Sequence, residues 1–489
     1  MNFFGKKRLA GLMLAAVVAG APLASVAFAQ EAAAPPAAEA AAPEAAPAPD
    51  AGAVTATPAE APATASEAAE PAAPEPVLMA HQKKLELDGG AAAWILTSTA
   101  LVLMMTVPGL ALFYGGMVRK KNFIATVAQS FAITCVVTLV WMGITYGMSF
   151  GVNPSEGLNK YVGSFSLIFL KGVTIDTAFA SAPQLPEFLW VVYQMTFAII
   201  TPALIAGAFA ERMKFSAMLL FMVLWSIFVY APICHWVWGG GWLGGLGVLD
   251  FAGGTVVHIN AGVAGLVCAL VLGPRKGYGS ENMAPNNLVF TMVGASLLWV
   301  GWFGFNAGSE WAADGLASAA MLNTQVATAA AALAWMTVEW IERKKPGMLG
   351  LASGAVAGLV AITPAAGFVN PQGALLVGLA GGVAGYAGAV WIKKAFKYDD
   401  SLDAFGVHGI AGITGALLTG LLADKAINSA GEGASIVKQL MGVSATIVWS
   451  GAVSFVILMV CKFTTGLRVS EEGEVEGLDL ALHGEALHE

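Results

Sequence analysis

Residues 258 to 265 are HINAGVAG, and residues 408 to 415 are HGIAGITG. The two octets share the pattern H-x-x-A-G-(V/I)-x-G, and each lies inside a long apolar stretch. They fall in the fifth and tenth such stretches, and an offset of five reverses the direction in which the copies would cross a bilayer. This pattern indicates an inverted-topology repeat, whose interface near the membrane midplane usually holds a transport path. The alternative is chance similarity between short segments rich in Gly and Ala.

The composition around these octets is that of a membrane protein. Of the 489 residues, 57% are hydrophobic and 11% are charged, whereas a soluble domain carries about 25% charged residues. We therefore predict an all-α integral membrane protein with an inverted five-plus-five repeat, because stretches of about 20 apolar residues recur along the chain. The predicted transmembrane helices number eleven, at residues 91–116, 124–150, 188–210, 215–234, 252–273, 287–307, 318–341, 349–368, 373–392, 404–423 and 439–466.

The charges of the connecting segments predict the orientation. Every second connection is basic, as at 119–121 and 343–345, whereas 235–251 and 308–317 contain no Lys or Arg. Because Lys and Arg prefer the cytoplasmic side, we expect the amino end outside and the carboxyl end inside. The net charge of −8 is modest and gives no reason to expect a nucleic-acid partner.

The amino-terminal region divides into two predicted segments. Residues 1–29 have a basic start, an apolar run and an Ala-Phe-Ala ending, which predicts a signal peptide; the alternative is an uncleaved first anchor. Residues 30–85 are predicted to be a disordered Ala/Pro-rich tether, because this composition cannot offset the entropy of ordering. Residues 86–466 would then form the transporter domain with eleven spans, and 467–489 a cytoplasmic tail. These features predict a multi-pass protein of a bacterial cytoplasmic (inner) membrane with a periplasmic amino terminus.

Two of the six histidines, His258 and His408, lie deep within apolar stretches. An ionisable side chain inside a membrane is costly and by default indicates a functional site. The alternative is a core histidine bonded to a backbone carbonyl, the commoner role of a lone buried histidine. Equivalent positions in a repeat favour function, and two facing imidazoles in a dry path would be neutral and able to pass a proton.

Two acids precede the spans that carry these histidines. Asp250 begins the string DFAGGTVVHIN, and Asp403 begins DAFGVHG. Each is an expected helix N-cap, a role that Asp serves well. A functional role would require the acid to be buried and its charge to favour a nearby cation. For Asp250 both roles are predicted, and they are compatible.

Aromatic residues gather at three places near membrane level. Trp238 lies in HWVWGGGW, Phe197 in YQMTFA, and Phe303 and Phe305 in GWFGFNAGS, where Ser309 ends the string. Most Trp residues near an interface are membrane anchors. Aromatic faces also bind small cations, a hydroxyl can accept a hydrogen bond from one, and Phe side chains can close a narrow path to hydrated ions.

No metal site and no cofactor are predicted. The four cysteines lie in or beside apolar segments, and none forms a CxxC pair. The paired histidines lack a third ligand at suitable spacing. Each cysteine is therefore expected to be a small buried hydrophobic residue.

The chain resembles the Amt family of ammonium transporters, from residue 86 to about 485. The strings that carry the resemblance are PGLALFYGG at 108–116, AERMKFSA at 210–217, VWGGGW at 237–242, DFAGGTVVHIN at 250–260, GWFGFNAGS at 301–309 and FGVHG at 405–409. The resemblance implies a homotrimer with one pore per subunit. By the same resemblance, Trp238, Phe197 and Ser309 would form an outer ammonium site, and Phe197 and Phe305 a stacked gate.

The resemblance also implies roles for the remaining residues. His258 and His408 would be the twin pore histidines, and Asp250 the essential acid beside the outer site. Tyr193 stands where the family often has Phe. The tail at 466–485 is similar to the segment through which members couple to a PII-type regulator.

The leading prediction for function is ammonium uptake, in which the cation loses a proton outside and passes the histidines as ammonia. Potassium has no proton to lose and would be refused. A passive channel for ammonia gas is a second hypothesis, distinguished by the absence of current. A sensor is a third, although only a short acidic tail follows Phe463. An enzyme is disfavoured, because no nucleophile, metal cluster or cofactor motif is visible.

Overall fold

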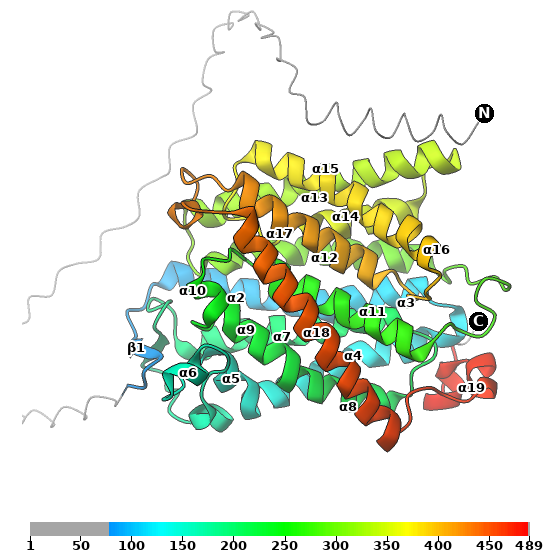
Figure 1. Cartoon of the computed structure of the whole chain (residues 1–489), viewed down its shortest axis with the longest axis horizontal. Coiled ribbons are helices and arrows are strands. Elements are labelled where there is room, and N and C mark those ends of the chain that lie inside the picture. Colours follow the sequence, from blue (N-terminus) through cyan, green and yellow to red (C-terminus); the bar gives the residue numbers. More distant parts are fainter. Residues whose placement is uncertain (1–77, 488–489) are drawn as a thin grey trace, which may run out of the picture. The chain divides into compact units, whose positions relative to one another are not determined.

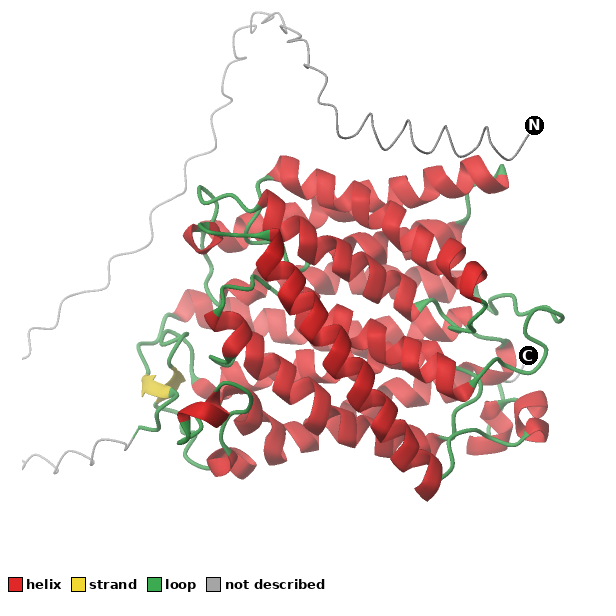
Figure 2. Ribbon diagram, in the orientation of Figure 1, coloured by secondary structure: helices red, strands yellow, loops and turns green. Residues whose placement is uncertain are grey.

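The computed structural model describes residues 78–487 as a bundle of helices (Figures 1 and 2). The predicted signal peptide at 1–29 and the predicted tether up to residue 77 lie outside the described residues. The bundle confirms the predicted all-α membrane architecture, because its helices are long and apolar and their outer surfaces expose large hydrophobic side chains. Figure 1 shows α18 running obliquely across the front of the bundle.

Within the described residues, ten helical stretches are long and apolar enough to cross a membrane. They are built from α2 (Gly89–Met104) with α3 (Ala111–Met117), α4 (Phe123–Val140) with α5 (Tyr146–Phe150), α7 (Glu187–Phe209), α8 (Phe215–Trp225) with α9 (Ala231–Val237) and α10 (Trp242–Gly245), η6 (Gly254–Ile259) with α11 (Asn260–Leu272), α12 (Leu288–Ala307) with η7 (Gly308–Glu310), α13 (Gly315–Arg343), α15 (Pro371–Tyr386) with η8 (Ala387–Ile392) and α16 (Lys393–Phe396), η9 (Phe405–Ile410) with α17 (Ala411–Leu422), and α18 (Ile436–Thr464).

The helix at the eighth predicted span is shorter than the helical stretches at the other ten. This helix, α14 (Met348–Ile362), has 15 residues, fewer than the about 20 that a bilayer-spanning helix needs. It packs extensively on α13 and α15, and nearly all of its side chains after Leu351 are buried. Helices therefore occur at all eleven predicted positions, but α14 is short and lies inside the bundle.

Small residues hold α13, α14 and α15 together. A Cβ atom added to Gly382 would lie 2.4 Å from the carbonyl oxygen of Ala331, and one added to Gly385 would lie 2.8 Å from the Ala357 side chain. These backbones therefore approach too closely for any residue but glycine.

The last glycine of each repeat octet packs on an equivalent partner helix. Gly265 of α11 faces Ala208 of α7, with 3.1 Å from an added Cβ to the Ala208 Cβ. Gly415 of α17 faces Ala361 of α14, where an added Cβ would meet the Ala361 carbonyl oxygen at 2.0 Å. The third and eighth predicted spans thus occupy equivalent places beside the fifth and tenth, as an inverted repeat requires.

A short two-stranded sheet lies at one end of the bundle. Strand β1 (Gln82–Lys84) pairs antiparallel with β2 (Thr177–Phe179), and Gln82 lies opposite Phe179. The tether was predicted to extend to residue 85, but residues 82–84 are part of the folded unit. The reason is a buried polar cluster in which Glu187 accepts hydrogen bonds from Gln82 at 2.6 Å and Tyr146 at 2.9 Å and contacts His81 Nε2 at 2.9 Å.

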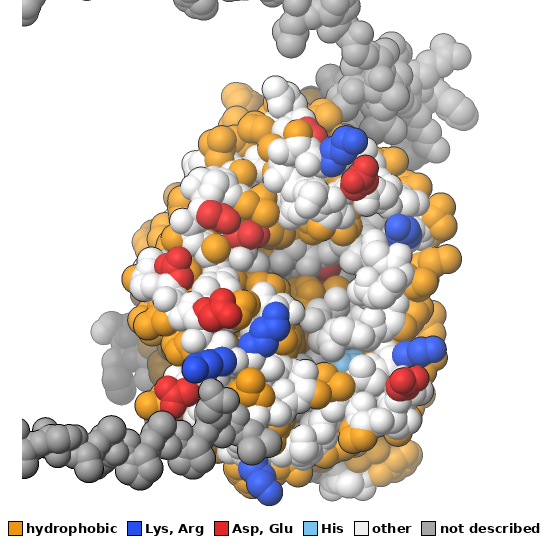
Figure 3. Space-filling model, turned by 90° about the vertical axis from the view of Figure 1, so that its left-hand side faces the viewer, with side chains coloured by type: hydrophobic (Ala, Val, Ile, Leu, Met, Phe, Trp, Pro, Cys, Tyr) orange, Lys and Arg blue, Asp and Glu red, His pale blue; other side chains and the backbone are white. Residues whose placement is uncertain are grey.

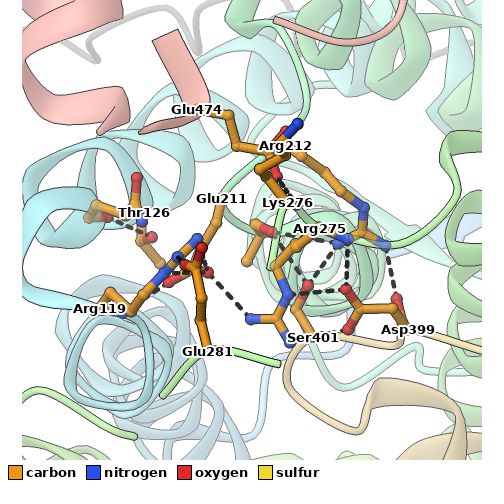
Figure 4. A network of polar contacts seen from close by, with 12 residues as sticks. Arg119, Thr126, Glu211, Arg212, Arg275, Lys276, Glu281, Asp399, Ser401 and Glu474 are labelled. Carbon is orange, nitrogen blue, oxygen red and sulfur yellow. Dashed lines mark hydrogen bonds and ion pairs between the residues drawn. The ribbon is translucent and has the colours of Figure 1, made fainter. Parts of the chain in front are cut away.

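The opposite end of the bundle carries a network of buried charges (Figure 4). Glu211 accepts hydrogen bonds from the Arg119 backbone at 2.7 Å and from Arg275 Nη1 at 3.0 Å. Asp399 binds the same Arg275 through both carboxylate oxygens, at 2.8 and 2.9 Å. Burial alone would raise the pKa of Glu211 and that of Asp399, but the guanidinium groups more than compensate and lower both pKa values below their usual range.

The carboxyl-terminal segment packs against this end. Its helix α19 (Glu471–Glu476) contains the buried Glu474, which accepts hydrogen bonds from Lys276 N at 2.6 Å and Arg468 Nη2 at 2.7 Å. Further along, the Asp479 carboxylate accepts two backbone hydrogen bonds, from Ile124 and Ala125 at the start of α4. The predicted tail is therefore docked on the connection that contains Lys276 and on the start of α4.

Candidate functional site

An aromatic cluster lies at the end of the bundle that carries β1. The rings of Phe197 and Trp238 meet edge to face, with centroids 5.9 Å apart. Tyr193 packs on Phe197 at 5.1 Å, and its hydroxyl lies 3.3 Å from the Ser309 hydroxyl. Trp238 is held by a hydrogen bond of 2.8 Å from its Nε1 to the backbone oxygen of Asp250. The three residues predicted for an outer cation site, Trp238, Phe197 and Ser309, are thus brought together.

Two phenylalanine rings follow this cluster. Phe197 of α7 and Phe305 of α12 are stacked, with centroids 4.2 Å apart and an interplanar angle of 27°. Both side chains are buried, at 1% and 0% exposed. The predicted pair therefore exists as a stack of buried apolar rings, which carry no hydrogen-bonding group. Phe303, which lies two residues before Phe305, takes no part in the stack.

The two histidines lie directly beyond the phenylalanines. The His258 ring is 5.9 Å from Phe305 and 5.4 Å from His408, with an interplanar angle of 19° between the imidazoles. Trp302 also stacks on His258, at 5.2 Å and 22°. Three of the four imidazole nitrogens, all except Nε2 of His408, are buried with no hydrogen-bond partner among residues 78–487. These nitrogens remain available to a solute in the path.

Glycine allows the two histidines to face each other. A Cβ added to Gly262 would lie 2.3 Å from the backbone nitrogen of Gly409, so α11 and η9 cross with backbones in contact. Gly412, the matching residue of the second octet, would bring an added Cβ to 3.3 Å from the His258 Cβ. The two octets share a spacing in which a glycine follows the histidine by four residues, and the structure explains it: the glycine of one copy packs against the other copy.

Asp250 is buried, and its carboxylate binds the free backbone N–H groups at the start of the helical segment that carries His258. Its carboxylate accepts four backbone hydrogen bonds, from Gly253, Gly254, Thr255 and Val256, at 2.6 to 3.0 Å. The capping prediction for Asp250 is therefore confirmed, and the carboxylate caps four backbone N–H groups. Because its backbone oxygen also holds Trp238, Asp250 connects the outer aromatic cluster to the histidine segment.

The equivalent acid in the second repeat is Asp400, not Asp403. Asp400 accepts hydrogen bonds from the backbone nitrogens of Ala404 at 3.1 Å and Phe405 at 2.7 Å, at the start of η9. Asp403 instead pairs with Lys393 and is partly exposed. The N-cap prediction for Asp403 is thus wrong. The sequence did contain the correct signal, because Asp250 and Asp400 each precede their histidine by eight residues.

The rings of Trp238, Phe197, Phe305, His258 and His408 form a continuous row from one end of the bundle to its middle. Figure 3 shows the end face that carries β1, with a hollow near its middle and charged side chains around it. Trp302 belongs to the row but was not singled out from the sequence. Its only signal was its place three residues before Phe305, on the same face of α12.

No group of three or more metal-ligating side chains occurs among residues 78–487. His235 of α9 is fully buried, and its ring nitrogens lie 2.9 and 2.7 Å from the backbone oxygens of Ser149 and Asn159. It is thus a core histidine of the kind considered for His258. By contrast, neither ring nitrogen of His258 has a hydrogen-bond partner in the part of the chain that the structure describes.

An inverted repeat of membrane helices around a buried row of aromatic and imidazole rings defines an integral membrane transport protein. Residues 93–487 match the family model described as Ammonium Transporter Family. The chain is 50% identical over 415 residues to an ammonium transporter of Aquifex aeolicus, covering 83% of this chain and 95% of that one. It is 49% identical over 397 residues to an ammonium transporter of Bacillus subtilis, covering 80% and 96%.

A solved structure, that of Saccharomyces cerevisiae Mep2, superposes with a TM-score of 0.72 at 33% identity, covering 79% of this chain and 91% of that one. The fold, the family model and the sequence relatives agree. The chain belongs to the Ammonium Transporter Family.

Proposed function

We propose that this protein carries ammonium across the membrane as ammonia plus a separately moved proton. The observation that carries this proposal is the pair of stacked, buried imidazoles, three of whose nitrogens have no hydrogen-bond partner among the described residues. A core histidine would be bonded, as His235 is. An ammonia molecule can donate to and accept from such nitrogens, and two adjacent imidazoles can pass a proton between them.

The outer aromatic cluster is the proposed recruitment site. The faces of Trp238 and Phe197 attract a small cation, and the Ser309 hydroxyl can accept one of its hydrogen bonds. The Ser309 hydroxyl donates to the backbone oxygen of Phe305 at 2.8 Å, which leaves its lone pairs for the cation. Buried Asp250 adds a negative charge behind Trp238 that favours a cation there.

The stacked phenylalanines are the proposed gate. Phe197 and Phe305 must part for a solute to pass, and an apolar constriction opposes a charged, hydrated ion far more than neutral ammonia. Ammonium can lose its charge by giving up a proton, whereas potassium cannot. The gate and the histidine pair together would therefore select for a solute that can be deprotonated.

We also propose an oligomeric state, a membrane and an orientation for the protein. We infer a homotrimer in a bacterial inner membrane, with eleven spans, the amino end outside and the carboxyl end inside. The alternating basic connections support this orientation, and the similarity to the family supports the trimer. The docked tail, with Glu474 on the connection that contains Lys276 and Asp479 on the start of α4, is the proposed contact region for a PII-type regulator.

Uptake by a bacterium that lacks its own ammonium transporters tests the function. Cells that express this chain should accumulate radiolabelled methylammonium, and excess ammonium should compete for entry. The Trp238→Ala variant should weaken apparent affinity by roughly tenfold, the value of about 1–2 kcal/mol for a partly desolvated cation–π contact. Accumulation no greater than in cells without the protein would refute the proposal.

A further inference from the structure

An apolar groove between α11 and α18 ends at the exposed side chain of Lys462. The groove has a volume of about 560 Å³ and is lined by Val267, Leu270 and Val271 of α11 and by Phe455, Met459 and Lys462 of α18. No described residue forms an ion pair or a hydrogen bond with the exposed Lys462 ammonium. We infer that this groove is a binding site for one anionic phospholipid, with an acyl chain in the groove and the phosphate at Lys462.

The dimensions suit an acyl chain. The groove follows α18 from Phe455 to Lys462, a rise of about 10 Å, which is well inside the about 15 Å of hydrocarbon in one leaflet. Its walls are open on the membrane side, because Leu270 is 61% exposed and Phe455 is 50% exposed. A cavity of this volume is within the range of about 300–1,000 Å³ typical of ligand sites.

The charges favour an anionic headgroup. Lys462 lies in the last turn of α18, at the end of the helix that the basic connections place on the cytoplasmic side. At the end of α11, Arg468 donates from Nη1 to the backbone oxygen of Leu272 at 3.1 Å, but its charge is paired with buried Glu474 at 2.7 Å, so the charge offered to a headgroup is that of Lys462. A basic group beside a gap between membrane helices on this side attracts anionic lipids.

Native mass spectrometry of the purified full-length chain tests the site, with dioleoyl-phosphatidylglycerol and dioleoyl-phosphatidylcholine as probes. We expect tighter binding of the first lipid. Lys462→Gln should weaken it about fivefold, the contribution of one Lys near an anionic surface, and Lys462→Arg should preserve it. Leu270→Trp should weaken both lipids by filling the groove. Lys394→Gln and Val456→Trp, at exposed positions outside the groove, should change neither affinity.

Four results would overturn the inference. These are equal binding of the two lipids by the unmodified chain, an equal effect of Lys394→Gln and Lys462→Gln, full displacement of the lipid by millimolar inorganic phosphate, and a change in the number of chains per particle with Leu270→Trp. The third would indicate a headgroup-only anion site, and the fourth an interface between copies. Because the assay counts bound lipid, its failure would leave the proposed transport function untouched.

Discussion

Aromatic packing explains why the ring nitrogens of His258 have no hydrogen-bond partner among the described residues. Trp302 and Phe305 cover His258 with ring faces, and the nearby backbone is a helix whose own hydrogen bonds are made. Desolvation at such a place disfavours a positive charge, so both rings are expected to be neutral at rest. The pairing of the histidines could be predicted from the octets. Trp302 could not, because its stacking depends on the distance between α11 and α12.

The loss of stability on replacing Asp250 or Asp400 should scale with the number of backbone hydrogen bonds that each carboxylate accepts. An Asp→Asn substitution leaves one side-chain oxygen as an acceptor. Asp250→Asn should therefore leave two of four backbone N–H groups without a hydrogen bond. Asp400→Asn should leave one of two without a hydrogen bond. Each buried donor left without a hydrogen bond costs about 1–3 kcal/mol. Thermal unfolding in detergent should show roughly twice the loss for Asp250→Asn.

Asp314→Asn is the matched control for the capping prediction. Asp314 caps α13 through a single oxygen, Oδ1, which accepts from Leu316 and Ala317. Asparagine keeps that oxygen, so the unfolding temperature should hardly change. Equal unfolding temperatures for the Asp250 and Asp400 variants and the unmodified chain would show that these carboxylates do not hold the helix starts.

At the scale of elements, hydropathy located the helices but not their irregularities. The segments η6 and η9, which begin the two repeat helices, are π-helical, and no periodicity in the sequence distinguishes them from α-helix. This irregular start explains the error at Asp403. The N-cap rule selects the acid nearest the apolar run, but here the chain before the helix folds back so that a more distant carboxylate reaches the free nitrogens. Alignment of the two repeats would have identified Asp400.

The crossing of the repeat helices should be sensitive to a single methyl group. A Cβ at Gly262 would lie 2.3 Å from the Gly409 nitrogen, which is backbone and cannot swing away. Gly262→Ala should therefore lower stability by about 1–3 kcal/mol, the usual range for overpacking, and separate the histidines. Gly245→Ala, where nothing lies within 4 Å, should be neutral in the same unfolding assay. A stable, fully active Gly262→Ala variant would contradict the close crossing.

The ion pairs of Glu211 with Arg119 and Arg275 predict that the stability of the protein depends on pH. Glu211 has a lowered pKa, so its contribution to stability is present above the ordinary value of about 4 and is lost as pH falls through the lowered value. Glu211→Gln should therefore destabilise the protein at pH 7, and the difference from the unmodified chain should shrink below about pH 4. Exposed Glu156→Gln is the control. A difference that is constant with pH would show that the Glu211 charge is not involved.

At the scale of the whole molecule, the row of rings is assembled from helices that are distant in sequence. Phe197 and Phe305 lie on the third and sixth predicted spans, Trp238 lies just after the fourth, and the histidines lie on the fifth and tenth. Each residue could be singled out from its local string, but their order along one path is a property of the packed bundle. The family resemblance supplied that order as an expectation, and the ring distances agree with it.

The proposed orientation can be measured directly. Reporter fusions placed after Lys121 and after Asp314 should report opposite sides of the membrane, with the first cytoplasmic, because 119–121 is basic and 308–317 contains no Lys or Arg. The two fusions sample connections that follow the first and sixth predicted spans. A report from the same side for both would contradict the predicted topology.

Current recorded on a solid-supported membrane tests the central claim most directly. Proteoliposomes with the unmodified chain should give a transient current with an ammonium pulse and none with potassium. His258→Ala and His408→Ala should each reduce that current by about tenfold or more or admit potassium, since a wetted path admits ions. The double variant should cost less than the sum of the singles, as for residues that act as a unit. If both Ala variants insert normally and retain unchanged ammonium current and unchanged rejection of potassium, the histidines do not handle the proton.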